Sequence, residues 1–254
     1  MCTHRQVTAL GVNMVGHYLR CVHRLFIYTC RILRIVALSV GALGCGATPR
    51  SAAADVSGED MRRLPPDRAG ALPDIMMVKA DRGRTLGSDS AKITLLVISD
   101  YQCAACRSWF TSTLPLLRAE YFDRGAVRLV WSHYPLRTHP SAVHAASAAL
   151  CASAQGKFWD ASEHLFASAA LRDTTFGRAS VIDSIAGVPG VDAFTFANCI
   201  ESKRMYRQIR LDIDWVDINR VGVPLALYDA GRKLPGTTST VTLRKTLDSL
   251  IAHN

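Results

Sequence analysis

The first 50 residues of this 254-residue chain contain no lysine, aspartate or glutamate, although they hold six arginines. Those arginines account for most of the net charge of +9, which falls to +3 when they are set aside. Proteins that bind nucleic acid carry their basic residues on the surface of the folded domain. Here most of the excess positive charge lies in the N-terminal segment instead. We therefore expect no nucleic-acid partner.

That segment also lacks an apolar run of membrane-spanning length. The run Ile35–Gly44 is much shorter than the ~20 residues that a spanning helix needs, and it follows Arg31 and Arg34. This arrangement is typical of a signal-peptide core. Residues 1–46 are therefore predicted to be an export segment, and residues 47–73, rich in alanine, proline, arginine and aspartate, a linker.

Two ways of processing this segment fit the sequence. ALGC at Ala42–Cys45 resembles a bacterial lipobox, which would make Cys45 a lipidated N-terminus, although Ala42 stands where leucine is commonest. The small residues Ala52–Ala54 allow ordinary cleavage instead, which would remove Cys45. In both cases the body of the protein is exported, either to the periplasm or to a membrane anchor that faces the cell exterior.

Export makes disulfide bonds between some of the eight cysteines expected, because thiols tend to pair in an oxidising compartment. Four of them lie in the body of the chain, and four cysteines allow three pairings. We favour pairing of the neighbours Cys103 and Cys106, with Cys151 joined to Cys199.

Ligand spacing argues against a metal site. A zinc site at Cys103 and Cys106 would need two further ligands with their own close spacing, but Cys151 and Cys199 are far from the pair and from each other. The five histidines of the body form no HxxxH or HExxH pattern. We predict no metal ligands and favour a redox role for the pair over a metal-binding or structural one.

Hydrophobic periodicity predicts an α/β domain over residues 74–254. Apolar runs at 93–98 and 126–134 have the length of buried strands, and a short first strand is predicted near 75–78. Between the two runs, apolar residues on one helical face predict a helix that Pro115 should kink. Strand, helix and strand in this spacing are typical of a βαβ unit with parallel strands.

A helical region follows from about residue 138 to residue 215 and includes one long helix from about 191 into the 210s. Two short strands around residues 229–231 then predict a hairpin, and a leucine-rich helix at 239–253 closes the chain. This order of elements predicts an α/β sandwich with an inserted all-helical subdomain.

The CAAC segment lies where the strand should end and the helix begin. Cys103 would then occupy the N-cap region, and Cys106 the first turn, near enough to close or to resolve a disulfide. Unpaired N–H groups and the positive end of the helix dipole favour a thiolate at Cys103, which makes it a nucleophile and a good leaving group. These two cysteines are the candidate catalytic residues.

Neighbouring residues are given structural roles. Asp100 could move protons during thiol exchange, but capping of a turn or of the helix start is favoured. Trp109 and Phe110 are candidates for an apolar rim around the cysteines, with core packing favoured for Phe110. His139 and His144 are interpreted as cap and surface residues of the helical region.

Residues 86–110, LGSDSAKITLLVISDYQCAACRSWF, resemble the active-site segment of the DsbA-like thioredoxin-fold proteins, and the likeness extends to the C-terminus. The resemblance implies a thioredoxin-like fold with an inserted helical subdomain, in which Cys103 attacks and Cys106 resolves. It also implies a cis-proline at Pro224 facing the cysteines. A cis bond there would leave the backbone of Val223 free to pair with an extended substrate. The alternative is a trans proline that starts a strand.

Relatives of this type sometimes carry a second, structural disulfide, which the resemblance places at Cys151 and Cys199. Closing so long a loop contributes about 4 kcal/mol to stability by chain-entropy arithmetic. Two buried free thiols are the alternative.

Two departures from the family bear on the direction of exchange. Many relatives carry proline or histidine between the cysteines, whereas Ala104 and Ala105 supply no cation, so that only the helix terminus would stabilise the Cys103 thiolate. This predicts a less oxidising disulfide than in the strongest oxidases of the family. Val223 before the proline, where many relatives have threonine, favours oxidation.

The sequence therefore predicts an exported thiol–disulfide oxidoreductase that forms disulfides in reduced or unfolded secreted proteins. A membrane redox partner, such as a quinone-linked oxidase, would reoxidise it, and the domain needs no cofactor. A disulfide reductase or isomerase of the same fold is one alternative, although residues 46–85 are short for the added N-terminal domain that isomerases use to dimerise. The other is a lipid-anchored module that binds a metal or a client protein without turnover.

Overall fold

The computed structural model describes residue 62, residues 75–168, residue 171 and residues 178–253 apart from 223, 230, 231 and 237. Every described residue belongs to one compact unit within Ala54–Asn254. The predicted export segment, which includes Cys45, lies outside the described residues. So does the predicted linker, apart from Arg62. Within the described part, no helix has both the length and the apolar character needed to cross a membrane.

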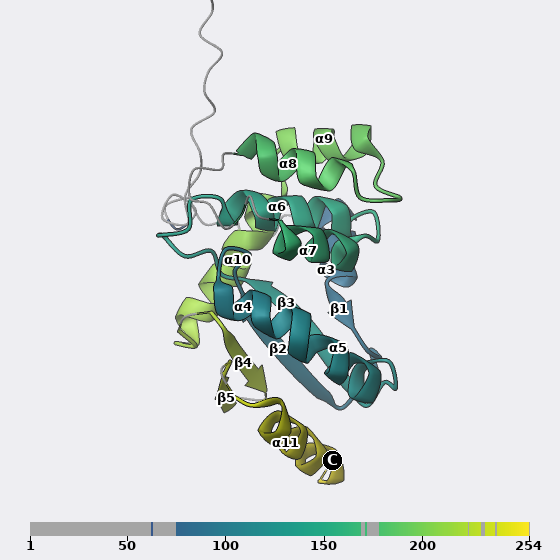
Figure 1. The fold of residues 1–254 in the computed structure, drawn as a ribbon, viewed down its shortest axis with the longest axis vertical. Coiled ribbons are helices and arrows are strands. Elements are labelled where there is room, and N and C mark those ends of the chain that lie inside the picture. The colour runs from purple at the N-terminus through teal and green to yellow at the C-terminus, as the bar shows by residue number, and fades with distance from the viewer. Residues whose placement is uncertain are drawn as a thin grey trace, which may run out of the picture. The chain divides into compact units, whose positions relative to one another are not determined.

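A five-stranded mixed sheet in the order β1-β3-β2-β4-β5 forms the centre of the described unit (Figure 1). Its strands are β1 (Thr85–Leu86), β2 (Ile93–Ser99), β3 (Val127–His133), β4 (Ala226–Asp229) and β5 (Arg232–Pro235). The central strands β2 and β3 are parallel, with Ser99 beside His133, and the other pairings are antiparallel. The segments that follow β2 and β3 therefore leave the sheet at the same edge.

Helices surround this sheet and form the inserted subdomain. The described helices are α3 (Ile75–Gly83), α4 (Ala104–Ser108), α5 (Leu114–Leu117), α6 (Ala142–Ser153), α7 (Phe158–Ala167), α8 (Arg178–Ala186), α9 (Ala193–Glu201), α10 (Met205–Ile218) and α11 (Thr240–Ala252), with π-helical turns η1 (Trp109–Thr113) and η2 (Arg118–Phe122). Figure 1 shows α4 and α5 lying across the central strands, with α6 to α9 grouped beyond the end of the sheet.

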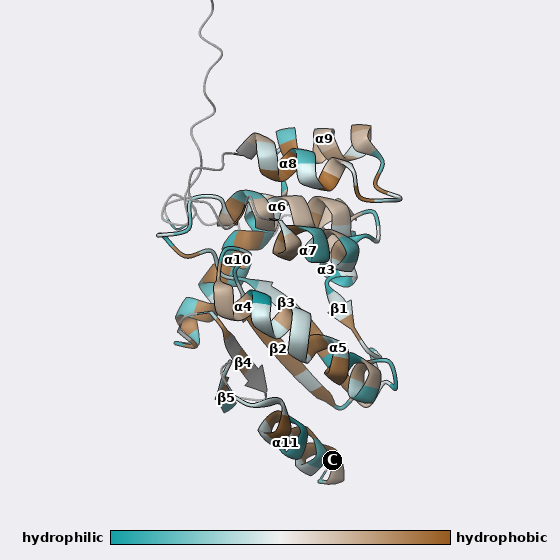
Figure 2. Cartoon of the chain, in the orientation of Figure 1, coloured by the Kyte–Doolittle hydropathy of each residue, from teal (hydrophilic) through white to brown (hydrophobic). Residues whose placement is uncertain are grey.

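The two faces of β2 pack against different helices, as expected for a strand buried on both sides. Leu95 belongs to the main core together with Leu117 of α5 and Leu243 of α11. Ile98 points the other way and forms a smaller cluster with Val216 of α10. Figure 2 shows hydrophilic and hydrophobic residues alternating along α10 and α11. The buried residues of the two helices include Val216 and Leu243, which belong to these clusters.

Two predictions of local structure are wrong. Residues 75–78, predicted as a strand, belong to α3, which buries Met77 and Ala80 at helical spacing, and the first strand is the two-residue β1. The single long helix predicted from residue 191 is divided into α9 and α10. The break lies at Lys203, whose φ of 53° is in the left-handed region.

The helix after the cysteines departs from α geometry around Pro115. It runs as α4, η1, α5 and η2, and Pro115 is the second residue of α5. Because proline has no N–H to donate to the carbonyl four residues earlier, the preceding turn loses an α-helical hydrogen bond and widens into η1. The apolar face predicted from the spacing of Phe110, Leu114, Leu117 and Tyr121 is nevertheless buried along its whole length.

Small side chains pack the inserted subdomain around α6. All twelve residues of α6 are buried, and α3, α7, α8, α9 and α10 all contact it. His144 is among the buried residues, so its interpretation as a surface residue is wrong. Cys151 of α6 and Cys199 of α9 form a disulfide with their Cα atoms 5.8 Å apart, across 48 residues of sequence.

Candidate active site

Cys103 begins the helical segment that follows β2. The chain turns tightly here: the Cys103 N–H donates to the Asp100 carbonyl (3.1 Å), and the Asp100 Oδ1 accepts from the Gln102 N–H (2.7 Å). Cys103 keeps extended backbone angles (φ −74°, ψ 120°) while its carbonyl already accepts from the Arg107 N–H (3.0 Å). Cys103 is therefore the N-cap residue of α4.

Cys106 lies one turn further on, and its N–H donates to the Sγ of Cys103 over 3.3 Å. Both cysteines are free thiols, so the structure represents the reduced state of the pair. Cys103 is half-buried, whereas Cys106 is completely buried. A thiol of another protein can therefore reach Cys103 but not Cys106.

The two thiols differ sharply in acidity. The hydrogen bond from the Cys106 side chain lowers the pKa of Cys103 to about 6, and the backbone N–H groups of Cys106 and Ala105 add to this effect. Burial and the Asp100 carboxylate act in the opposite direction. Burial raises the pKa of Cys106, and the neighbouring Cys103 raises it further. At neutral pH the reduced pair is therefore a thiolate at Cys103 and a thiol at Cys106.

Asp100 joins the turn before Cys103 to the loop after β3. Its side chain is fully buried, and its Oδ2 accepts from the Leu136 N–H and from the Nδ1 of His139, both at 2.8 Å. The side chain of His139 is 24% exposed. Its hydrogen bond to Asp100 raises the pKa of His139, and the charge of Cys103 raises it further.

His139, predicted to be a cap or surface residue of the helical region, instead contacts Asp100 beside the turn that precedes Cys103. The available signal was the predicted pair of parallel strands, because the carboxyl ends of adjacent parallel strands meet at one edge of a sheet. Asp100 follows one of those strands and His139 the other. For Asp100, the prediction that it caps a turn agrees with its bond to Gln102.

Gln102 ties the same turn to the inserted subdomain. Its Oε1 accepts from the Ser141 N–H at the start of α6 (2.7 Å), and its Nε2 donates to the Leu171 carbonyl (3.3 Å). The helical subdomain therefore helps to fix the backbone just before Cys103.

An aromatic cluster belongs to the same hydrophobic core as Cys106. Trp109 and Phe110 are both buried, and both contact Trp131 of β3, with the Phe110 ring edge-on to it at 5.6 Å between centroids. The interpretation of Trp109 as part of an exposed rim is therefore wrong. Tyr101 is also buried, and its hydroxyl pairs with Ser162 of α7 at 2.7 Å.

A buried ion pair fixes the end of β3 to α10. Arg84 donates to Asp212, whose Oδ2 also accepts from the His133 N–H at 2.8 Å. Burial, aided by the charge of Arg84, lowers the pKa of His133 well below its usual value, so His133 is neutral. The sequence analysis did not single out these three residues, which hold the edge of the sheet beside the site.

Pro224 lies in the loop that leads into β4. Ile98 of β2 pairs with Ala226, so Pro224 lies beside the end of β2 and at the same edge as the cysteines. Val223 is outside the described residues, and with it the bond predicted to be cis. The peptide bond from Pro224 to Leu225 is cis.

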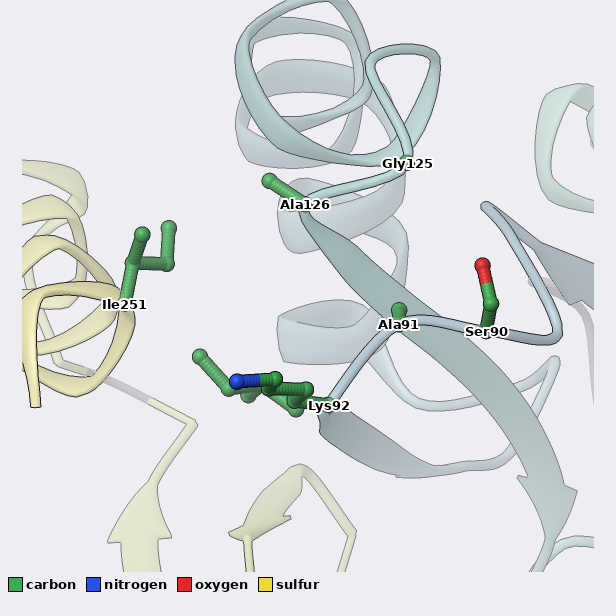
Figure 3. Close-up of a pocket in the computed structure, with 7 residues that line it drawn as sticks. Ser90, Ala91, Lys92, Gly125, Ala126 and Ile251 are labelled. Atoms are coloured by element: carbon green, nitrogen blue, oxygen red, sulfur yellow. The ribbon is translucent and has the colours of Figure 1, made fainter. Parts of the chain in front are cut away.

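A cavity of about 270 Å³ lies elsewhere in the unit (Figure 3). It is lined by Ser90, Ala91, Lys92, Ile93, Gly125, Ala126 and Ile251. Six of these residues lie at the amino ends of β2 and β3, a full strand away from the cysteines, and Ile251 belongs to α11. The lining includes no carboxylate, histidine or thiol. Among the described residues, no three histidine, cysteine or acidic side chains are grouped so that they could hold a metal ion.

Residues 79–223 match the family model described as Thioredoxin. The chain is also 27% identical over 169 residues to a protein from Bacillus anthracis named probable disulfide bond formation protein D, and the match covers 65% of this chain and 76% of that protein. It is 37% identical over 103 residues to Na(+)/H(+) antiporter NhaA 1 from Mycolicibacterium vanbaalenii, which covers 40% of this chain but only 16% of the antiporter. That second match concerns a small part of a much longer protein.

Solved structures have the same fold. Oxidised BdbD from Bacillus subtilis superposes with a TM-score of 0.59 at 17% identity, over 67% of this chain and 94% of that one. DsbA2 from Pseudomonas aeruginosa gives a TM-score of 0.52 at 26% identity, over 66% of this chain and 93% of the other. The predicted thioredoxin-like fold with an inserted helical subdomain is confirmed.

Proposed function

The chain belongs to the thioredoxin family, and from that premise we propose that it is an exported thiol–disulfide oxidoreductase that forms disulfides in other proteins. One observation carries the proposal: the accessible Cys103 has a pKa of about 6, while burial raises the pKa of its partner Cys106. Such a pair can exchange with an external thiol at one sulfur and resolve internally at the other. The name of the Bacillus anthracis relative, a probable disulfide bond formation protein, supports the same function.

The oxidised protein would react in two steps. A substrate thiolate attacks the Sγ of Cys103, a substrate–Cys103 disulfide forms, and the Cys103–Cys106 bond breaks. Cys106 leaves as a thiolate and takes up a proton, since its burial disfavours the charge. A second substrate thiolate then attacks the substrate sulfur of the mixed disulfide, and Cys103 leaves as a stable thiolate. The substrate loses two electrons and two protons; the protein gains both electrons and one proton, and the other proton goes to solvent.

Stabilisation of the Cys103 thiolate favours the oxidising direction. A stabilised thiolate lowers the free energy of the reduced protein, which raises the reduction potential of its disulfide. The sequence analysis allowed only the helix terminus to provide this stabilisation, whereas the Cys106 side chain contributes the largest part. Reoxidation would then need a membrane partner that accepts two electrons, such as a quinone-linked oxidase.

Substrate binding and localisation complete the proposal. The loop at Val223 and Pro224 would pair with an extended segment of a reduced or unfolded secreted protein beside Cys103, by addition of a strand to the sheet edge. The N-terminal segment would direct export, with either lipidation at Cys45 or cleavage after Ala54. The domain itself would use no cofactor.

The function can be tested with the oxidised protein and a reduced, unfolded disulfide protein as substrate. Catalysed recovery of the native substrate, together with a reduction potential measured by glutathione titration, would support an oxidase. Cys103→Ser should abolish exchange. Reduced Cys106→Ser, mixed with the disulfide-bonded form of the substrate, should accumulate a substrate–Cys103 disulfide on a non-reducing gel, because Cys103 attacks one substrate sulfur, the other leaves as a thiolate, and no Cys106 thiol is present to break the mixed disulfide. Efficient reduction or reshuffling without net oxidation would instead assign the reductase or isomerase direction, and stoichiometric copper binding without thiol exchange would contradict the proposal.

A further inference from the structure

The buried carboxylate of Asp100 creates an electrostatic problem at the site. It lies in the turn that positions Cys103, and its charge raises the pKa of that thiol. An uncompensated buried carboxylate is itself unfavourable, and it opposes the thiolate on which the proposed exchange depends. Two backbone N–H groups, of Gln102 and Leu136, donate to the carboxylate, and a nearby positive charge would balance it further.

His139 is placed to supply that charge. Its Nδ1 donates to the Asp100 Oδ2 over 2.8 Å, and its side chain stays partly open to solvent, so the ring can take up a proton. The backbone fixes it as well, because the His139 N–H donates to the Leu136 carbonyl (3.2 Å) and its own carbonyl accepts from the Ala142 N–H (3.2 Å). These bonds hold the imidazole beside the turn.

The coupling between His139 and Cys103 works in both directions. Two groups of the described structure raise the pKa of His139: the Asp100 carboxylate, which contributes more, and the charge of Cys103. Attraction between opposite charges acts on both groups, so a protonated His139 favours the Cys103 thiolate. Cys106, the other titratable group at the sulfur, remains a neutral thiol.

We propose that His139 is a positioning residue of the oxidoreductase site: held by Asp100, its imidazolium neutralises that carboxylate and stabilises the Cys103 thiolate from outside the CAAC segment. This inference rests on the proposed function for its consequence, a more oxidising disulfide. It also brings a cation to the turn before Cys103, through Asp100, although Ala104 and Ala105 supply none. The cation comes from the loop after β3 rather than from between the cysteines.

The test compares His139→Gln, which keeps an amide donor for Asp100 but loses the charge, with His139→Lys, which keeps a charge. Thiolate absorbance should show that His139→Gln raises the pKa of Cys103 by about half a unit to one unit, whereas His139→Lys should stay near the wild type. The glutathione equilibrium of His139→Gln should move about three- to tenfold towards the oxidised protein, and tenfold corresponds to about 30 mV. His164→Gln is the matched control, because His164 is exposed on α7 and should change neither quantity.

A double-mutant cycle separates charge from structure. In the Asp100→Asn background there is no carboxylate to neutralise, so His139→Gln should change the pKa of Cys103 less than half as far as in the wild type. Far-ultraviolet circular dichroism identifies any variant that fails to fold. A His139→Gln protein that folds and keeps the wild-type thiolate pKa and glutathione equilibrium would overturn the inference. Failure of the proposed function is distinguishable, because the wild type would then oxidise no substrate whatever the thiolate pKa of the variants.

Discussion

The backbone N–H of Cys106 donates to the sulfur of Cys103 across 3.3 Å, so the second cysteine of the pair stabilises a thiolate on the first. Its side chain adds a second hydrogen bond, which is the largest cause of the lowered pKa of Cys103. The acidity of Cys103 is therefore set largely within one helical turn.

Removal of the Cys106 thiol should make Cys103 less acidic. Cys106→Ala keeps the backbone N–H but loses the side-chain donor, so the pKa of Cys103 should rise clearly above the value of about 6 in the native protein. Cys106→Ser, which retains a hydroxyl donor, should raise it less. Thiolate absorbance against pH measures both. An alanine variant that still titrates near 6 would show that the helix start alone sets the acidity.

The stability of the reduced protein should depend on pH between about 6 and about 8.5. The pKa of Cys103 is about 6 in the folded protein, below the ~8.5 of an unfolded thiol, so its contribution is complete above the unfolded value and is lost as the pH falls through 6. The pKa of Cys106 is raised in the folded protein. Above ~8.5 the unfolded thiol ionises while the folded one does not, so Cys106 lowers the free energy of unfolding there. His139, with a raised pKa, contributes below ~6.5 and loses its contribution as the pH rises through its folded value.

Urea unfolding of the reduced protein at several pH values measures this dependence. Cys103→Ser should lose the rise in stability between pH 6 and 8.5, and the contributions of Cys106 and His139 should become smaller because Cys103 raises the pKa of both. An identical pH profile for the variant and the native protein would refute the assignment of the thiolate to Cys103.

Loss of the disulfide in the helical subdomain should destabilise the protein without removing the site. Cys151→Ala with Cys199→Ala opens a loop of 48 residues, and the free energy of unfolding should fall by about 4 kcal/mol. Denaturant unfolding measures the change. Glutathione titration of the folded variant should still report exchange at Cys103, and loss of that exchange in folded protein would mean that the subdomain controls the site directly.

The buried ion pair at the end of β3 should tolerate joint replacement better than the loss of one member. Asp212→Ala leaves Arg84 with Asp81 as its remaining carboxylate partner and the His133 N–H without its acceptor, which should cost about 1–3 kcal/mol. The double variant Arg84→Met with Asp212→Leu removes both charges and should be more stable than Asp212→Ala. Thermal or urea unfolding of the three proteins decides this, and a double variant less stable than the single one would contradict it.

Much of the fold could be predicted because its signals are local. The buried runs at 93–98 and 126–134 and the hairpin around residues 229–231 correspond to strands of the sheet. Residues 75–78 could not be assigned correctly, because four residues are too few to distinguish a strand from a helical turn. Their helical state depends on packing of α3 against α6, which is far away in sequence.

Spacing alone determined that Cys103 and Cys106 lie within one helical turn, directly after a buried strand, because each of these features involves neighbouring residues. Only the tertiary structure decided which thiol is buried and which charges surround the other. Asp100 and His139 are 39 residues apart and meet because two parallel strands end at the same edge of the sheet. Burial and electrostatic coupling depend on such distant neighbours, so no local pattern in the sequence could specify them.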